Sequence, residues 1–381
     1  MTFFAIYIFD FFIFARVNFL KYPTMKIGLV NCISLVSFDE TSLESGVGGA
    51  QTYVICLSKA LADMGHEVTV VCQCFSEHTA DGVRWIPLSN IFSVDIDYSV
   101  SRLWRLGFEA VIVSRPEYNV LNAVLRSGIP SYLVFHGLNE GLCIDGGDML
   151  RHPGVRGVVT LTSWHAEYMK GLFGLESSAV AVIPNGISPD DFIGMDEPHP
   201  VDHSILWSSE PQRGLDILCA LGTKIRKHIH DFGIYVSSPS YCANLPENDS
   251  YVYLGHLSKS SLYGQMHKHA VWFYPSVFRE TFCITALEAC MSGNMPVLPV
   301  RYGPSDIFAP FADIIGMKYN FEDNWQEASE EAVEIICRNI LDYDAPHNCE
   351  LRKSIRDFII CNFTWKKVAA MYSELLAECN S

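Results

Sequence analysis

The sequence is poor in basic residues, and this shortage excludes one class of partner. Its 381 residues include 27 Lys and Arg against 43 Asp and Glu, which gives a formal net charge of −16. Nucleic-acid binding depends on basic patches that neutralise phosphates, so we expect no nucleic-acid partner. An anionic ligand would have to be held by local hydrogen-bond donors, because the overall charge does not attract it.

Recognisable metal-binding spacings are also missing. The 13 Cys residues include no C-x-x-C pair, and the only close two are Cys72 and Cys74. An odd number of scattered thiols is typical of a long chain in a reducing compartment. No zinc-ligand pattern is found either. We therefore expect a cytoplasmic protein with buried, free thiols.

The sequence also lacks a membrane span of ordinary length. Residues 1–24 are strongly apolar and aromatic, but Asp10 interrupts the run and Arg16 ends it before the ~20 residues that a span needs. The segment has neither a basic n-region nor a small-residue cleavage site, so a signal peptide is not indicated. We expect an appendage, with Met25 as the natural beginning of the fold. The alternative is an anchor that associates weakly with a membrane.

The length and the 49% hydrophobic content suggest two domains with separate cores. Residues 188–202 are rich in Pro and Asp without apolar periodicity, which predicts a linker. We accordingly expect an N-terminal domain at 25–187, a C-terminal domain at 203–362 and a last helix within 363–381.

The first domain opens with the pattern of a doubly wound α/β fold. A short apolar strand follows Met25, and then come a glycine turn at Gly48 and Gly49, an amphipathic helix and a second strand. The two glycines let the backbone approach a phosphate or sugar closely, and Gln51 lies in the same turn. The spacing is not G-x-G-x-x-G, so a nicotinamide-binding site is not favoured.

The stretch 272–306 carries the most informative chemistry. It predicts a strand, a loop with Glu280, a helix at about 282–292 that includes Glu288, and another strand. Helix geometry places the two carboxylates roughly 10–12 Å apart, farther than a glycosidase pair at about 5–9.5 Å. They therefore suit the opposite ends of one elongated ligand. Glu288 has apolar neighbours, so its buried carboxylate needs a partner.

The start of this helix predicts an anion site. The first free backbone N–H groups would be those of Phe282, Cys283, Ile284 and Thr285, following Thr281, with the positive end of the helix dipole behind them. An acid, an anion site and a second acid form the layout needed to hold a sugar, a diphosphate and a ribose.

Several motifs together resemble one known family. The pattern P-S-x-x-x-E-x-F-x-x-x-x-L-E-A at 275–289 resembles the donor site of the retaining GT-B glycosyltransferases of family 4. The runs GGA-Q-x-Y-V and L-A-x-x-G-H-x-V-T-V, the P-N-G-I at 184–187 and the late F-T-W are similar to the family as well. The resemblance covers about 25–380. It implies an α/β GT-B fold, with two Rossmann-like domains facing across a cleft and a last helix that crosses back to the first.

The resemblance also implies roles for residues beside the transferred sugar. Glu280 would lie by that sugar, and Glu288 would accept hydrogen bonds from the ribose hydroxyls. His136, at the end of the strand predicted at 131–137, would contact the sugar from the first domain, so Glu280 and His136 are the catalytic candidates. The Gly-rich, acidic loop at 138–150 suits a lid that contacts the acceptor.

Further donor contacts follow from the same resemblance. Members of the family bind the diphosphate with two basic residues. Arg213 matches the second of these basic positions, whereas Ser209 falls near the first. A guanidinium gives a bidentate phosphate contact, so one of the two charges is retained. Gly255, at a turn after its strand, is placed near the nucleotide base. The family commonly has Gly where this sequence has Cys283.

These observations predict a metal-independent hexosyltransferase that needs no cofactor. It would move a sugar, with retention, from a nucleotide-diphosphate sugar to a hydroxyl of a glycan, lipid-linked or protein-linked acceptor. The D-x-D at Asp95 and Asp97 is interpreted as a solvated loop, because it does not follow a strand that delivers a nucleotide.

Three alternatives stay open. One is a nucleotide-sugar 2-epimerase of the same fold, and another is a catalytically retired transferase that acts as a binding subunit. The third is an inverting transferase, which would need a positioned base. The sugar, the base and the acceptor are not determined by these motifs.

Overall fold

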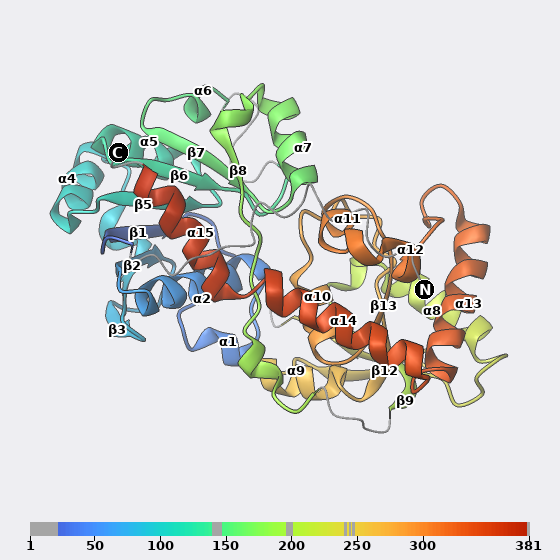
Figure 1. Cartoon of the computed structure of the whole chain (residues 1–381). Coiled ribbons are helices and arrows are strands. Elements are labelled where there is room, and N and C mark those ends of the chain that lie inside the picture. Colours follow the sequence, from blue (N-terminus) through green and yellow to red (C-terminus); the bar gives the residue numbers. More distant parts are fainter. Residues whose placement is uncertain are drawn as a thin grey trace.

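The computed structural model shows two parallel β-sheets, flanked by helices, among the residues that it describes (Figure 1). It describes residues 22–138, 147–195, 201–239, 242–243, 245 and 248–378. Most of the apolar N-terminal segment, and the centre of the loop that we expected to form a lid, lie outside the described residues. The two sheets build separate lobes, and the N-terminal half of the chain forms one of them (Figure 1).

Within the described residues, the first sheet has eight strands in the order β3-β4-β2-β1-β5-β6-β7-β8. All neighbouring pairs are parallel except the hairpin of β3 with β4. Its strands are β1 (Lys26–Asn31), β2 (Glu67–Cys72), β3 (His78–Ala80), β4 (Val83–Pro87), β5 (Ala110–Ser114), β6 (Ser131–Val134), β7 (Val155–Thr160) and β8 (Val180–Val182). Its helices are α1 (Ser42–Ser45), α2 (Gly49–Asp63), α3 (Leu88–Ile91), α4 (Ile96–Leu106), α5 (Tyr118–Ser127), α6 (Gly147–Leu150) and α7 (Ser163–Phe173).

In the part of the chain that the structure describes, the second sheet has six parallel strands in the order β11-β10-β9-β12-β13-β14. Its strands are β9 (Asp202–Trp207), β10 (Gly233–Ser237), β11 (Val252–Gly255), β12 (His269–Phe273), β13 (Met295–Pro299) and β14 (Gly316–Met317). The helices that follow β9 are α8 (Leu215–Ile225), α9 (Lys259–Met266), α10 (Ile284–Met291), α11 (Gly303–Ile307), α12 (Ala312–Ile315), α13 (Trp325–Leu341), α14 (Pro346–Asn362) and α15 (Trp365–Ala377). Short 3₁₀ turns include η4 (Pro189–Phe192) and η5 (Pro211–Arg213).

The first sheet has a hydrophobic core on each face, as strands covered by crossover helices require. Neighbouring residues of β1 enter opposite cores, because successive side chains of a strand alternate. Leu29 packs in the core that includes Val54 of α2 and Val368 of α15. Val30 packs in the core that includes Leu121 of α5. The α/β, two-domain GT-B fold predicted from the sequence is confirmed by this arrangement.

The last helix lies on the first lobe, although α14 before it packs beside α10 of the second (Figure 1). Thr364 caps α15 by accepting a hydrogen bond from a backbone N–H. The Tyr53 hydroxyl on α2 donates to the Tyr372 hydroxyl at 2.6 Å. A Cβ atom at Gly186 would lie only 2.7 Å from the backbone nitrogen of Trp365, so the chain crosses here only with glycine. The crossing therefore joins the two lobes through backbone contact.

Two expectations about the chain as a whole can be examined in the described residues. None of their helices has both the length and the apolar character needed to cross a bilayer. All cysteines described there are free. The buried ones are Cys32, Cys56, Cys72, Cys74, Cys290 and Cys337.

The D-x-D motif lies at the start of α4, away from a strand end. The Asp95 side chain caps the helix by accepting from the Tyr98 N–H at 3.1 Å. Asp97 forms an exposed ion pair with Arg126 at 2.9 Å. The motif is thus part of a helix start, where the sequence suggested a loop, and both carboxylates have protein partners.

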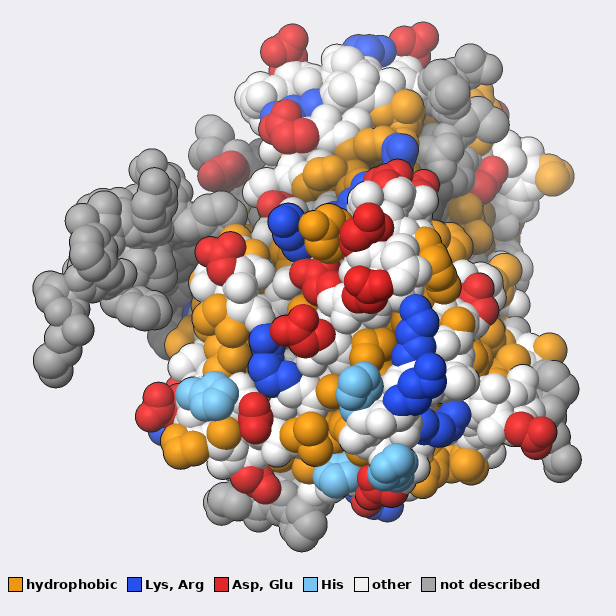
Figure 2. Space-filling model, turned by 90° about the vertical axis from the view of Figure 1, so that its right-hand side faces the viewer, with side chains coloured by type: hydrophobic (Ala, Val, Ile, Leu, Met, Phe, Trp, Pro, Cys, Tyr) orange, Lys and Arg blue, Asp and Glu red, His pale blue; other side chains and the backbone are white. Residues whose placement is uncertain are grey.

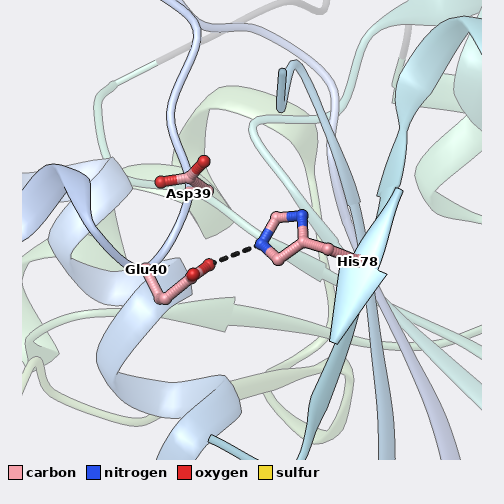
Figure 3. A group of neighbouring side chains, drawn as sticks. All are labelled: Asp39, Glu40 and His78. Carbon is pink, nitrogen blue, oxygen red and sulfur yellow. Dashed lines mark hydrogen bonds and ion pairs between the residues drawn. The ribbon is translucent and has the colours of Figure 1, made fainter. Parts of the chain in front are cut away.

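A group of three side chains ties the segment before α1 to the β3 hairpin (Figure 3). Asp39 Oδ1 accepts hydrogen bonds from the N–H of Thr41 at 3.1 Å and from its hydroxyl at 2.6 Å. Glu40 Oε2 lies 2.8 Å from His78 Nε2, and His78 Nδ1 lies 3.0 Å from the Ser76 carbonyl. The three ligating atoms are within 4.8 Å of one another, but the hydrogen bonds between Asp39 and Thr41 and the ion pair of Glu40 with His78 already account for their positions.

Replacing Glu40 by Gln is expected to destabilise the protein at about pH 5.5 more than at about pH 9. The hydrogen bond that His78 donates to the Glu40 carboxylate raises the pKa of His78 above its ordinary value, so folding favours the imidazolium. The resulting stabilisation is complete below the ordinary His pKa of about 6.5 and is lost as the pH rises through the raised pKa. Urea unfolding of both proteins at the two pH values measures this difference. A loss of stability that does not depend on pH would contradict the ion pair.

Candidate functional site

A cavity of about 390 Å³ lies between the carboxyl ends of the two sheets. Its lining includes residues that closely follow strands of both: Arg115 after β5, His136 after β6, Asn185 after β8, Ser208 after β9 and Tyr274 after β12. Ligands of open parallel sheets bind at this edge, and the volume is that of a small-molecule site. The cavity is therefore the candidate active site.

The cavity brings together nearly all the site residues predicted from the sequence. Those that line it are Glu280, His136, Arg213, Ser209, Glu288, Thr281, Phe282, Cys283, Ile284, Gly48, Gly49 and Gln51. Gly255 is not among the lining residues. It has a φ of +75°, and its carbonyl accepts a hydrogen bond from the Ser237 hydroxyl at 3.1 Å. Its assignment to the nucleotide base stays a prediction.

The loop between β12 and α10 is held by the opposite lobe. The Thr281 hydroxyl donates to the His136 carbonyl at 2.5 Å, and the Thr281 carbonyl accepts from the Thr162 hydroxyl at 3.0 Å. Nearby, the Asp306 carboxylate accepts from the Trp164 N–H at 2.7 Å. These contacts cross between the lobes, so they set the position of the loop that carries Glu280 relative to His136.

A glycine of the second lobe supports the same loop from behind. The Gly303 N–H donates to the Glu280 carbonyl at 2.8 Å. A Cβ atom at Gly303 would lie 2.3 Å from the Thr281 carbonyl oxygen, which is a severe clash with backbone. Only glycine lets α11 approach so closely, and the approach fixes the backbone on which the acidic side chain is mounted.

Glu280 is held by one cation and one hydroxyl. Its Oε1 atom is ion-paired with Arg213 and accepts a hydrogen bond from the Tyr274 hydroxyl at 2.8 Å. The Arg213 guanidinium also lies 5.1 Å from the centre of the Phe278 ring and 3.7 Å from the Glu210 carboxylate. Both side chains of the ion pair are mostly buried, so Glu280 is aimed into the cavity rather than solvated.

The charge of this carboxylate shapes its neighbours. Burial opposes the charge of Arg213, but Glu280, Tyr274 and Glu210 together outweigh burial and raise the pKa of the guanidinium. Burial and the same carboxylate raise the pKa of Tyr274 well above its ordinary value. Tyr274 therefore stays a hydrogen-bond donor, and Arg213 stays positively charged, throughout the ordinary pH range.

Glu288 has the partner that its apolar surroundings require. The Tyr263 hydroxyl, buried beneath α10, donates to Glu288 Oε1 at 2.7 Å. Burial and Glu288 together raise the pKa of Tyr263. Glu288 also lines the cavity, and a carboxylate has room for further hydrogen bonds, such as those from a pair of ligand hydroxyls.

The helix that follows Glu280 starts later than the sequence indicated. We expected it to begin near Phe282, but α10 begins at Ile284 with Cys283 as its N-cap. The first hydrogen bond of the turn runs from the Ala286 N–H to the Cys283 carbonyl at 3.2 Å. The reason is the backbone of Cys283, whose φ of +84° cannot belong to a right-handed helix. The anion site is therefore shifted toward Ile284 and Thr285.

A second helix start faces the first one across the cavity. Gly48 is the N-cap of α2, and a Cβ atom at Gly49 would lie 3.5 Å from the Cδ1 atom of Ile284. Both α2 and α10 thus direct the positive ends of their dipoles toward the same space. A bound anion would be met by backbone N–H groups from both lobes.

Backbone donors matter here because the charged side chains of the described lining balance each other. The charged lining residues are Arg115, Arg213, Lys259, Glu210, Glu280 and Glu288. Three basic groups against three acids give the cavity no net positive charge. On the outer face of the second lobe, acidic, basic and hydrophobic side chains are likewise interspersed (Figure 2). Two helix starts are therefore the main additional source of positive potential for an anionic ligand.

The positive φ of Cys283 leads to a stability prediction. Replacement by Gly is expected to leave the protein about 1 kcal/mol more stable than replacement by Ala. Both changes remove the thiol, but only Ala keeps a Cβ atom that is strained at this φ. Urea denaturation of the two variants measures the difference, and equal stability would mean that the backbone relaxes without cost.

His136 is fixed from three directions at the cavity wall. Its Nε2 atom lies 3.0 Å from the Ser114 hydroxyl, and its ring meets the Tyr53 ring edge-on with centroids 4.6 Å apart. Its carbonyl accepts from Thr281. On the same lobe, the Gln51 amide donates to the Ser34 hydroxyl at 3.0 Å. Residues of the first lobe are thus rigidly placed before any ligand enters.

Four functional candidates were missed by sequence reasoning. Tyr274, Tyr263 and Lys259 hold or neighbour the two acids, and Asn185 belongs to the P-N-G-I segment. Among the described residues, the buried Asn185 Oδ1 and Ser208 Oγ atoms lack a hydrogen-bond partner, although both residues line the cavity. A ligand or a bound water in the cavity would supply the partners of these atoms. The position of Tyr274 directly after β12 was the one available signal.

Comparison with known proteins identifies a related family and a shared fold. Residues 47–191 match the family model described as Glycosyltransferase Family 4. No curated protein sequence matches the chain. A glycosyltransferase from Rickettsia africae is 14% identical, with 94% of this chain and 100% of that one covered and a TM-score of 0.71.

Two further solved structures hold nucleotides. The catalytic domain of starch synthase IV from Arabidopsis thaliana, bound to ADP and acarbose, is 13% identical, with coverage of 93% and 99% and a TM-score of 0.63. The pneumococcal O-GlcNAc transferase GtfA, in complex with UDP and GlcNAc, is 14% identical, with coverage of 75% and 60% and a TM-score of 0.55. At these low sequence identities, the similarity to solved structures establishes a shared fold and nothing about activity.

Proposed function

We propose that this chain, whose residues 47–191 match the model of Glycosyltransferase Family 4, carries out the following reaction. The cavity moves a hexosyl group from a nucleotide-diphosphate sugar to a hydroxyl of a glycan or glycoconjugate, with retention at the anomeric carbon. The donor is held mainly by the second lobe, and His136 completes the sugar site from the first.

One arrangement carries this proposal. Glu280, paired with Arg213 and Tyr274, and Glu288, paired with Tyr263, line the same cavity on either side of the start of α10. A nucleotide-diphosphate sugar has hydroxyls at both ends and an anion between them. Its hydroxyls match the two carboxylates, and its diphosphate matches the N–H groups at Ile284 and Thr285.

The leaving group is stabilised by fixed positive charge. When the bond between the anomeric carbon and the phosphate oxygen breaks, its electron pair stays on the diphosphate. Arg213 and the two helix starts then face that growing charge, and Tyr274 keeps Glu280 in place. Because these groups supply the positive charge, the proposed reaction proceeds without a metal ion.

Glu280 acts on the sugar side of the same bond. Its carboxylate orients the sugar hydroxyls and stabilises the positive charge that develops at the anomeric carbon. The acceptor hydroxyl forms the new bond on the face that the diphosphate leaves, and its proton passes to a phosphate oxygen of the leaving group. This route needs no enzymic base, and contacts between the lobes exclude water that would otherwise hydrolyse the donor.

The test is a donor screen by isothermal titration calorimetry on the full chain. UDP-, GDP- and ADP-sugars are titrated into the wild type and into Glu288→Ala, with Glu334→Ala as a control at an exposed position on α13. We expect one nucleotide class to bind, with affinity reduced about 30-fold or more in Glu288→Ala, because a carboxylate accepting two hydroxyls is lost. Glu334→Ala should bind as the wild type does.

The alternatives give different results. A retired transferase that serves as a binding subunit would show no turnover even with a bound donor and a range of acceptors. A 2-epimerase would release a free altered sugar without any acceptor. NMR of the anomeric proton in the product separates retention from inversion. If no donor binds the wild type, the proposed function is wrong.

A further inference from the structure

The cavity continues beyond Glu288 to a lysine that the motifs did not single out. Lys259 is the first residue of α9 and lines the cavity. Its Nζ atom lies 5.6 Å from the centre of the Tyr263 ring, and the Tyr263 hydroxyl is bonded to Glu288. The ammonium and the carboxylate therefore neighbour the same tyrosine.

The order of groups along the cavity follows from helix geometry. Glu288 lies four residues after Ile284, so it is about 6 Å farther along α10 than the anion site. A donor with its diphosphate at Ile284 and its ribose at Glu288 extends its base past Glu288. Lys259 and its neighbours then form the end of the site that meets the base.

Apolar side chains from both lobes surround this end. Leu43 and Val47 come from the segment around α1, while Leu257 and Leu262 come from the segment around α9, and all four line the cavity. A Cβ atom at Gly46 would lie 3.3 Å from the Leu257 carbonyl, so the two segments approach closely. Apolar walls suit the flat faces of a nucleobase, and the Lys259 ammonium can donate hydrogen bonds to the polar edge of that base.

The lysine is held in place before a ligand binds. Its Nζ atom lies 3.7 Å from a carboxylate oxygen of Asp191, in η4 of the crossover between the lobes, and its side chain is mostly buried. The ammonium is thus confined to the base end of the cavity.

We propose that Lys259 determines which nucleotide the donor carries, by selecting bases with an exocyclic carbonyl oxygen, uracil or guanine, over adenine. An ammonium donates three hydrogen bonds and accepts none, so it favours the carbonyl edge of uracil or guanine and is a poorer partner for the adenine amino group. Solved structures of this fold hold UDP in one case and ADP in another. The fold therefore leaves the base to local residues. This inference rests on the proposed function.

Calorimetry on the full chain tests the proposal with UDP, GDP, ADP and inorganic pyrophosphate as probes. The variants are Lys259→Met, Lys259→Arg and, as a control, Lys227→Met at an exposed position after α8. We expect the wild type to bind UDP or GDP roughly tenfold or more tightly than ADP. Lys259→Met should weaken that preferred nucleotide about tenfold, while ADP changes less than about twofold and pyrophosphate is unaffected. Lys259→Arg should keep most of the preference, and Lys227→Met all of it.

Each contrary result has its own meaning. Preference for ADP in the wild type, or an undiminished preference in Lys259→Met, overturns the assignment of Lys259 while leaving the donor site intact. Equal weakening of pyrophosphate and UDP also overturns it, because the lysine would then bind phosphate. If the wild type binds no nucleotide at all, the proposed function fails and this inference with it. Pyrophosphate binding by Lys259→Met shows in the same experiment that the variant is folded.

Discussion

Replacing Glu280 by Gln is expected to reduce kcat by roughly 10²–10³-fold while changing the affinity for the free nucleotide diphosphate by less than about threefold. The amide has the size and shape of the carboxylate but no charge. It therefore keeps the packing beside Tyr274 and removes the stabilisation of positive charge at the anomeric carbon. In the proposed function, the nucleotide and phosphates bind elsewhere, at Glu288 and at the start of α10, both of which line the cavity.

Single-turnover kinetics and calorimetry with the nucleotide diphosphate measure the two quantities separately. Glu334→Gln, on the exposed face of α13, is the matched control and should retain full activity. If Glu280→Gln lost nucleotide affinity in proportion to turnover, the carboxylate would act in binding, and its assignment to the sugar would be wrong.

The second large effect is expected at Arg213, which is ion-paired with Glu280 and, in the proposed reaction, stabilises the leaving diphosphate. Arg213→Met should lower kcat/KM by roughly 10²–10³-fold, because the leaving group loses its nearest cation. It should also destabilise the fold by about 1–3 kcal/mol, since Glu280 is left as a largely buried carboxylate without its ion pair. Turnover assays and urea unfolding measure the two consequences.

The double variant Arg213→Met with Glu280→Gln separates these consequences. Without a charge at either position, no buried carboxylate is left unpaired, so most of the lost stability should return. Activity should not return, because neither the cation nor the acid is present. Recovery of activity in the double variant would mean that the ion pair merely restrains the loop.

Much of the fold could be predicted because it follows from local patterns. Apolar runs such as β1, the glycine stop at Gly293 and the Thr364 cap are read within a few residues of sequence, and the structure has elements there. The start of α10 could not be predicted in this way. Cys283 has a φ of +84°, and the loop before it is held by contacts of Thr281 and Gly303 with distant parts of the chain, which no local pattern reveals.

The candidate site likewise has features that the sequence predicts and features that it does not. The sequence predicts the spacing of Glu280, in the loop before α10, and Glu288, in α10, and both residues line the cavity. The side chains that pair with these two acids could not be predicted from the sequence. Tyr263 lies 25 residues before Glu288, and Arg213 lies 67 residues before Glu280, so only the sheet brings them together.

By itself, the sequence determined the α/β class, the family resemblance and the placing of two acids on either side of a helix start, because each depends on residues close together in the chain. The tertiary structure decided which cation meets Glu280, which hydroxyl holds Glu288 and where Lys259 lies. These pairings depend on strand order and on contact between two lobes. A one-dimensional pattern carries no information on how far apart two distant segments lie once the sheets have formed.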